Sequence, residues 1–466
     1  MGNMMKIKQL HLQNYGRFED LTVDFAPTEN RASNVTVIVG NNGAGKSQIL
    51  QALATGLSWF ISGLQNKVPS GNFINSNEIR NGKDISILNI KGEINKNLQS
   101  INNNIKNLDI YLKSNRQRDD EKFASLGGLE IIDFTENVKK DEISLPIITF
   151  YPVERSILTQ NIILDSSAKN LRQFVGYNLA LTNGIDFNSF IEWFRLKEDI
   201  ENAQIRKEVD KLMESLVREN NDNNRSIIVA HLAGLTAKEK VLEKNTDNQL
   251  QSVKSAISYF LDTIENVWID RSLQPPVMMV EKDGKDLNIN QLSQGEKSLL
   301  ALVGDIARRL AILNPSLDDP LQGEGIVMID EVDLHLHPKW QHDLIDKLVK
   351  TFPKVQFTLT THSPLIVSDR QDILVYSLDN GELQQMPNVY GEDANTLLND
   401  IFDVPARTPE IDKAFNDIRR AISHKELESA ESQINNIAKK VSSSNTELLK
   451  VRLMLAQAKL AQNKVS

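Results

Sequence analysis

A glycine-rich segment near the N-terminus has the residue types and the spacing of a phosphate-binding loop. It reads Gly-Asn-Asn-Gly-Ala-Gly-Lys-Ser and lies between a β-branched run at 35–39 and an amphipathic helix expected from Ser47. Glycines permit tight turns that aim backbone N–H groups at a phosphate, and the helix N-terminus adds a positive dipole end. We expect Lys46 to reach the β- and γ-phosphates of a nucleotide and Ser47 to hold Mg²⁺. The residues assigned to nucleotide binding are Gly40, Asn41, Asn42, Gly43, Ala44, Gly45, Lys46 and Ser47.

A second apolar run, at 325–329, ends in two carboxylates, Asp330 and Glu331. Carboxylates delivered by a strand beside a phosphate-binding loop are typical of nucleotide hydrolysis. Asp330 is expected to support Mg²⁺, directly or through water, and Glu331 to orient or deprotonate the attacking water. An acidic turn at a strand end is common by itself, so the preceding phosphate-binding loop is what favours the catalytic interpretation.

Two more motifs fit a nucleotide site. Ser293 and Gly295 precede a helix expected at 298–313. They suit either a simple N-cap or a second phosphate-binding helix end. His362 follows a buried run at 355–359 and has the position to contact a γ-phosphate, although a packing role is equally compatible with a single histidine.

The pair His335 and His337 leaves a metal site as a weaker alternative. The two residues are spaced by two in a loop-like stretch, and no third His or Cys ligand is evident. Because zinc normally takes four ligands in a structural site, this pair alone is a poor candidate.

Composition excludes several classes of protein. The 466 residues include 53 basic and 62 acidic ones, a net charge of −9, with 40% hydrophobic and 25% charged residues. This is ordinary globular composition, which excludes fibrous and wholly disordered chains. Cys is absent, which rules out disulfides and fits a reducing cytoplasm. No apolar signal core or membrane span is evident, so we expect no membrane. The acidic balance argues against a globally basic nucleic-acid binder but leaves a local basic face open.

Together the motifs resemble the ABC ATPases, with Walker A loop, signature, Walker B strand and switch histidine in that family's order. The resemblance implies that Ser293 and Gly295 of one subunit cover ATP bound by the Walker A loop of another, so that two ATP molecules hold a dimer. Asp333 matches the family's D-loop position between the two sites. The implied fold class is α/β, an ABC-type (RecF/SMC-like) P-loop ATPase with an inserted short helical arm region and a C-terminal helical extension.

The segment 12–18 narrows this resemblance. It is similar to the N-terminal strand and turn of the RecF/SMC-like branch, in which an Arg or Lys lies close to the nucleotide phosphates. That similarity assigns Arg17 to nucleotide binding, against the alternative of a solvated turn residue. One departure is that the family's Q-loop glutamine is not obvious. The equivalent stretch is 150–155, with Gln160 an unsupported candidate, so we expect slow hydrolysis.

Three further segments, 151–155, 191–195 and 391–402, resemble the RecF-like ATPases of bacterial anti-phage systems. Among these ATPases, the chain is most similar to the PtuA family of Septu systems, which is also found in some retrons. This resemblance implies an HNH nuclease partner of the PtuB type, held by a homodimer or a higher homo-oligomer. DNA contacts, direct or through that partner, stay open. After His362 the chain has no Toprim-like or HNH-like cluster, so we expect no nuclease activity of its own.

Two alternatives from other classes remain. A RecF-like DNA repair or recombination ATPase shares the same motifs. A transporter nucleotide-binding subunit fits less well, because the Q-loop glutamine is missing and an insertion follows the Walker A helix.

Composition also varies along the chain. Residues 65–142 are rich in Asn, Lys, Ser and Asp, and the weak apolar spacing around Ile101, Ile105, Leu108 and Leu112 favours a partly helical surface insertion. After Glu410 the apolar positions predict helices that either cap the ATPase domain or dock another subunit. The expected segments are 1–64 with the Walker A loop, 65–145 as the insertion, 146–185 continuing the ATPase core, 186–275 as a helical arm or lid, 276–405 with signature, Walker B and switch histidine, and 406–466 as a helical region for oligomer or partner docking.

Overall fold

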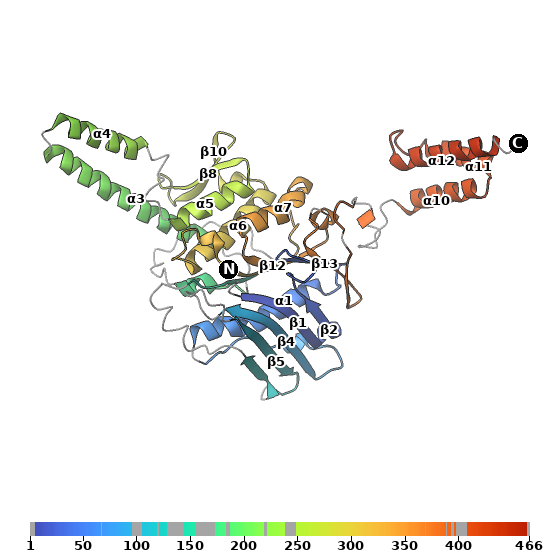
Figure 1. The fold of residues 1–466 in the computed structure, drawn as a ribbon, viewed down its shortest axis with the longest axis horizontal. Coiled ribbons are helices and arrows are strands. Elements are labelled where there is room, and N and C mark those ends of the chain that lie inside the picture. The colour runs from blue at the N-terminus through green and yellow to red at the C-terminus, as the bar shows by residue number, and fades with distance from the viewer. Residues whose placement is uncertain are drawn as a thin grey trace. The chain divides into compact units, whose positions relative to one another are not determined.

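The computed structural model divides the chain into two compact units, Met1–Gly391 and Glu392–Ser466 (Figure 1). Each unit is described separately below. The stretch around Gln160 and most of 391–402 lie outside the described residues. The structure describes residues 5–66, 68–95, 105–118, 121–127, 144–153, 173–182, 187–218, 221–237, 248–368, 370–387, 389–392, 396–397 and 408–463.

A six-stranded sheet forms the centre of the first unit, in the order β14-β13-β3-β12-β11-β7. The neighbours from β13 to β7 are parallel, and β14 pairs antiparallel at the edge. The strands β3, β7, β11 and β12 are buried along their whole length, as their Val- and Ile-rich sequences predict for a sheet covered on both faces. The bounds are β3 Val35–Val39, β7 Ile147–Tyr151, β11 Gly325–Ile329, β12 Val355–Thr361, β13 Leu374–Asp379 and β14 Glu382–Gln385.

Helix α1, Lys46–Gln65, lies between this sheet and a second one (Figure 1). It contacts β7 and β12 of the six-stranded sheet and β4 and β5 of the other. The second sheet is five-stranded and antiparallel, in the order β2-β1-β4-β5-β6. Its strands are β1 Met5–Tyr15, β2 Phe18–Asp24, β4 Ile85–Asn95, β5 Ile105–Asn115 and β6 Phe123–Gly127.

This second sheet corrects the expectation of a partly helical insertion at 65–145. Within that range β4, β5 and β6 extend the sheet begun by β1 and β2. In β5 the residues Leu108, Ile110 and Leu112 are all at most 1% exposed, a period of two that buries one face of a strand. The helical interpretation was wrong because it gave weight to the spacing of Ile105, Leu108 and Leu112 and overlooked Ile110.

The expected helical arm begins with an antiparallel pair, α3 Phe187–Arg218 and α4 Asp222–Ala237, followed by α5 Asn248–Phe260 (Figure 1). The range 186–275 is not helical throughout, because β8 follows α5. This strand belongs to a three-stranded sheet in the order β10-β9-β8. Its strands are β8 Ile264–Asp270, β9 Val277–Lys282 and β10 Lys285–Asn288.

Three helices follow the signature and Walker B segments. They are α6 Gln294–Leu313, α7 Pro338–Thr351 and the short α8 Pro364–Val367. The described residues of this unit also include four short 3₁₀ helices, Ser76–Glu78, Gln173–Tyr177, Ile289–Gln291 and Pro320–Gln322. Among the described residues, no helix combines the length and apolar character that crossing a bilayer requires.

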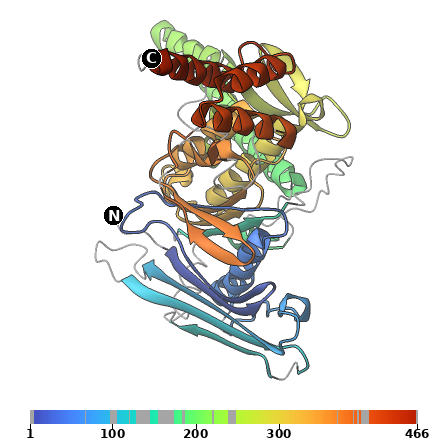
Figure 2. The same cartoon turned by 90° about the vertical axis from the view of Figure 1, so that its right-hand side faces the viewer.

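Residues 408–463 of the second unit form a bundle of three helices, α10 Pro409–Ser423, α11 Leu427–Ile437 and α12 Thr446–Asn463 (Figure 2). The helices expected after Glu410 are therefore confirmed. Their core includes Phe415, Ile418 and Val451, each 0% exposed. The bundle has its own apolar core, so it meets the main structural criterion for a separate domain.

Candidate nucleotide-binding site

The loop between β3 and α1 presents an open helix N-terminus. Helix α1 begins at Lys46, and its N-cap Gly45 has a left-handed φ of 108°. No side chain caps this end, and its first turn holds no acidic residue. The first N–H groups of a helix lack intrahelical partners and carry partial positive charge, so this end is suited to an anion.

Gly45 also allows the β1–β2 turn to approach the loop. A Cβ at this position would lie 2.7 Å from the Phe18 ring and 2.9 Å from Arg17 Cδ. The Arg17 guanidinium donates a hydrogen bond to the Gly43 carbonyl, and the Arg17 N–H donates to Gln48 Oε1 at 3.3 Å. Arg17 is therefore in contact with the loop, and its side chain is exposed.

The Lys46 ammonium spans the loop. Its Nζ donates to the carbonyls of Gly40 at 2.8 Å and Asn41 at 3.3 Å, and lies 2.8 Å from His362 Nε2. Burial lowers the pKa of Lys46, although the carboxylates Asp330 and Glu331 oppose that shift. Burial, followed by the charge of Lys46, also lowers the pKa of His362. A neutral His362 ring whose Nε2 accepts a hydrogen bond from the ammonium accounts for this contact.

The two residues at the strand end share one hydroxyl group, through the carboxylate of Asp330 and the backbone N–H of Glu331. Thr360 Oγ1 donates to Asp330 Oδ1 and accepts the Glu331 N–H at 2.8 Å. The N–H of Asp330 donates to the carbonyl of Tyr151 at 2.8 Å, which fixes the strand end on its other side. Glu331 has a left-handed φ of 45°, an uncommon conformation for a non-glycine residue that surrounding contacts must maintain.

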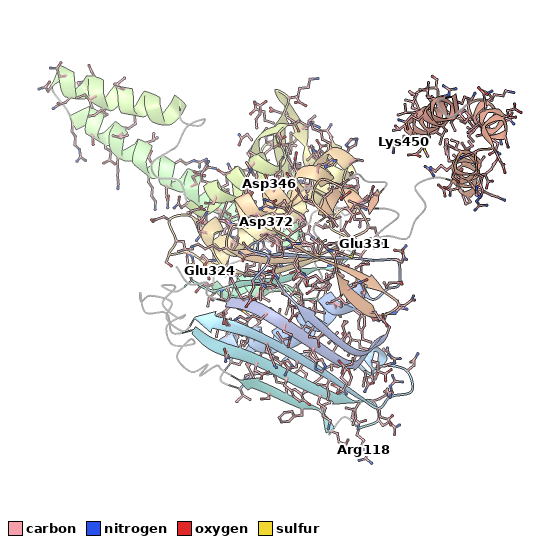
Figure 3. The ribbon with its side chains drawn as sticks, turned by 45° about the vertical axis from the view of Figure 1, so that its right-hand side comes forward. Arg118, Glu324, Glu331, Asp346, Asp372 and Lys450 are labelled. Carbon is pink, nitrogen blue, oxygen red and sulfur yellow. The ribbon has the colours of Figure 1, made fainter. Side chains whose placement is uncertain are left out.

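A cavity of about 400 Å³ lies where these segments meet. It is lined by residues from four parts of the sequence, and eight of its nine lining residues are among those expected from the motifs; Gln48 is the addition. Glu331 is labelled in Figure 3. The lining residues are Arg17, Asn42, Gly43, Gly45, Lys46, Ser47, Gln48, Glu331 and His362.

The other residues that the sequence assigned to the nucleotide site do not line the cavity. Asp330 is 2% exposed and Ala44 4%, so both support its wall. Asp333 accepts a hydrogen bond from the Thr361 hydroxyl, one residue before His362. Gly295 lies against the same loop, since a Cβ there would be 2.7 Å from the His335 carbonyl oxygen.

Ser293 occupies the N-cap of α6, as its capping interpretation predicts. Its hydroxyl donates to Glu296 Oε2 at 2.7 Å, and its N–H donates to the same oxygen at 2.9 Å. Lys282 Nζ lies 2.6 Å from the other Glu296 oxygen. Burial raises the pKa of Glu296, yet the hydrogen bonds from Lys282 and Ser293 outweigh it and hold that pKa below its usual value. Neither Ser293 nor Gly295 lines the cavity of its own chain.

The histidine pair has a structural explanation. His337 is the N-cap of α7, and its Nδ1 accepts the Lys339 N–H at 3.2 Å. Across the described ranges, no group of three His, Asp or Glu side chains is arranged to hold a metal ion. His337 therefore has a structural role at the start of α7.

One buried network was missed in the sequence. Asp305 on α6 accepts from Tyr151 Oη at 2.9 Å, Arg309 Nε at 2.7 Å and Arg308 at 2.6 Å. Burial raises the pKa of Asp305, but the two guanidinium groups hold it below its ordinary value. Because the Tyr151 carbonyl also accepts from Asp330, this network connects the signature helix to the Walker B strand end. The available signal was an Asp followed at three and four positions by Arg within an apolar helix.

Thr360 is a second residue that the sequence did not identify as part of the site. Thr360→Val keeps the side-chain volume but removes the hydroxyl shared by Asp330 and Glu331. We expect kcat for ATP hydrolysis to fall by about 10–100-fold, the usual effect of losing a group that orients metal and base residues, with ATP affinity changed by no more than a few-fold. Thr360→Ser retains the hydroxyl and should keep most of the activity. Equal rates for the valine and wild-type proteins would exclude this positioning role.

Comparison with known proteins places the chain in a family. The AAA ATPase domain family matches residues 5–367, which include every element of the cavity. The chain belongs to this family and is an ATPase by class, with an α/β fold that confirms the expected one.

Individual relatives refine this placement. The chain is 34% identical over 438 residues to the Retron Ec83 probable ATPase of Escherichia coli, covering 88% of this chain and 78% of that protein. It is 31% identical over 190 residues to the Septu protein PtuA of Bacillus mycoides, covering 39% of this chain and 26% of that one. The expected resemblance to PtuA and retron ATPases is confirmed.

Solved structures of lower identity also match. The Smc head domain of Pyrococcus furiosus is 16% identical, with a TM-score of 0.43, covering 82% of this chain and 96% of that chain. The recombination mediator RecF with ATP is 14% identical, with a TM-score of 0.39, covering 83% and 99% respectively.

Proposed function

We propose that this chain binds ATP with Mg²⁺ in the cavity described above and hydrolyses it slowly. The observation that carries the proposal is the meeting of Lys46 and the open α1 N-terminus with Glu331 and His362. These groups supply a cation, backbone donors, a base and a polar contact at one place. Mg²⁺ keeps several waters and binds nucleotide phosphates, so the Ser47 hydroxyl and the Asp330 carboxylate are sufficient protein partners.

The residues of the chain have separate roles in this proposal. Lys46 leaves the carbonyls of Gly40 and Asn41 and donates to the β- and γ-phosphates. Glu331, held by its backbone N–H, takes a proton from the attacking water. His362, released by Lys46, contacts the γ-phosphate. Arg17 adds positive charge at the wall of the site.

A second subunit completes the site in this proposal. Ser293 and Gly295 lie outside the cavity of their own chain, at the start of α6 next to the loop that holds Asp333. On a second copy, the same helix N-terminus can face the bound γ-phosphate in trans. Its approach requires the Ser293 hydroxyl to exchange its bond with Glu296 for one with phosphate, so ATP binding and dimerisation are coupled.

We further propose that the dimer, or a larger homo-oligomer, controls an HNH nuclease subunit in anti-phage defence in the cytoplasm. The similarity to retron and Septu ATPases supports this assignment. In the proposed complex, the ATPase unit changes state when it binds or hydrolyses nucleotide. The α3–α4 pair serves as the arm or lid, and the Glu392–Ser466 unit binds other chains. DNA contacts come through the nuclease or a local face of this chain.

Co-expression with the products of the neighbouring genes tests both parts. The complex is purified with ATP and Mg²⁺, and its mass is measured by light scattering. We expect an ATP-dependent multiple of this chain together with a nuclease subunit. An ATP-dependent dimer without a nuclease would contradict only the defence assignment and would favour DNA repair. A mass that does not depend on ATP would contradict ATP-dependent dimerisation.

A further inference from the structure

Helix α12 carries apolar residues on two opposite sides. Leu448, Val451 and Leu455 are 0%, 0% and 6% exposed and lie in the core of the three-helix unit. Leu449 and Leu453 are 51% and 59% exposed. At about 100° per residue, the second pair points away from the first three. Within the described part of this unit, only one of the two apolar sides is packed in the core.

The exposed residues form a continuous stripe along the helix. Leu449, Leu453, Ala456 and Leu460 follow one another at intervals of four, three and four positions, and Leu460 is 65% exposed. This is the spacing with which one helix packs against another. Single exposed leucines are ordinary on a protein surface, whereas an aligned row of them marks a binding surface. We call these four residues the leucine stripe.

Basic residues flank the leucine stripe on both sides. By helical angle, Lys450 lies on one flank, and Arg452 and Lys459 lie on the other. The one acidic residue of α12, Glu447, is 7% exposed and belongs to the buried side. Lys450 reaches Glu447 at 2.9 Å, and Lys459 reaches Glu431 of α11 at 2.7 Å. Their side chains nevertheless stay 64% and 43% exposed, and surface pairs of this kind are weak.

We propose that the leucine stripe binds an amphipathic helix of another protein, with apolar residues against the stripe and acidic residues along its flanks. Charge decides between this occupant and a second copy of α12. Two copies packed stripe to stripe would bring Lys450, Arg452 and Lys459 of each against the same basic residues of the other. An acidic helix instead meets them with opposite charge. This binding surface is independent of the nucleotide site.

The test uses the full-length chain and a fluorescent three-heptad peptide, with leucines at the same intervals and glutamates on both flanks. Fluorescence anisotropy should show saturable binding. Leu453→Asp should weaken it by about tenfold or more, because it places a charge at the centre of the contact. Val68→Asp is the matched control: Val68 is 80% exposed in the other unit and has no assigned role, so affinity should not change. ATP hydrolysis and the melting temperature should be unaltered in both variants.

A charge exchange makes the test specific. Arg452→Glu should weaken binding of the glutamate-flanked peptide and strengthen binding of a lysine-flanked version by several-fold. Wild-type protein that binds both peptides equally, or neither, would overturn the proposal. So would self-association in light scattering that Leu453→Asp abolishes, because a second copy would then occupy the stripe.

Discussion

Glu331→Gln should lower the rate of ATP hydrolysis by about 10²–10⁴-fold while leaving ATP affinity close to that of the wild type. The amide keeps the shape of the carboxylate but cannot take a proton from the attacking water. Its backbone N–H still donates to Thr360 Oγ1, and Asp330 keeps its own bond to that hydroxyl, so the site should keep its geometry. Single-turnover hydrolysis and equilibrium binding of a fluorescent ATP analogue measure the two effects separately.

The same strand provides a matched control. Glu324 lies just before β11 and Glu331 lies just after it; both residues are labelled in Figure 3. Burial raises the pKa of Glu324 to about 7, so Gln at that position resembles the protonated side chain. Glu324→Gln should therefore fold and hydrolyse ATP normally. Wild-type hydrolysis by Glu331→Gln would remove Glu331 from the catalytic step, and impaired binding would give it a different role.

The parts of the site that could be predicted from the sequence are short and contiguous. The Walker A motif needs only local glycines, one lysine and the adjoining helix. Its residues 40–45 lie between β3 and α1, and Lys46 and Ser47 begin α1. The strand that leads into Asp330 and Glu331 is predicted from an apolar run followed by two acidic residues. In such segments neighbouring residues determine the backbone, so local pattern is sufficient.

The parts that were missed depend on partners far along the chain. In the sequence Thr360 looks like an ordinary strand residue. Only the parallel pairing of β11 with β12 places its hydroxyl between the Asp330 carboxylate and the Glu331 N–H. The strand β5 was taken for a helix because Ile110 was overlooked, and its pairing with β4 across residues 85 to 115 places it in the sheet. Tyr151 and Asp305 are 154 residues apart. Sequence pattern reports periodicity, whereas these contacts are set by strand order and register.

Lys46→Ala should weaken ATP binding itself by about 10²-fold, because it removes charge-assisted hydrogen bonds to phosphate in a partly buried site. It also removes the cation that lies 2.8 Å from His362 Nε2. Since the charge of Lys46 contributes to the lowered pKa of His362, that pKa should rise in the variant, although burial continues to oppose the change. Calorimetry measures the affinity, and NMR titration of His362 measures the pKa.

The comparison of the two variants separates nucleotide binding from turnover. Lys46→Ala should fail to assemble with ATP, whereas Glu331→Gln should hold ATP and stay assembled, because only the chemical step is lost. If bound ATP, rather than its hydrolysis, controls a nuclease partner, the two proteins should give different defence phenotypes in cells. Lys83→Ala, which removes an exposed lysine that does not line the cavity, is the control and should match the wild type in every assay. Undiminished ATP affinity in Lys46→Ala would refute the phosphate-binding assignment of the loop, and identical phenotypes for the two variants would show that turnover is the controlling step.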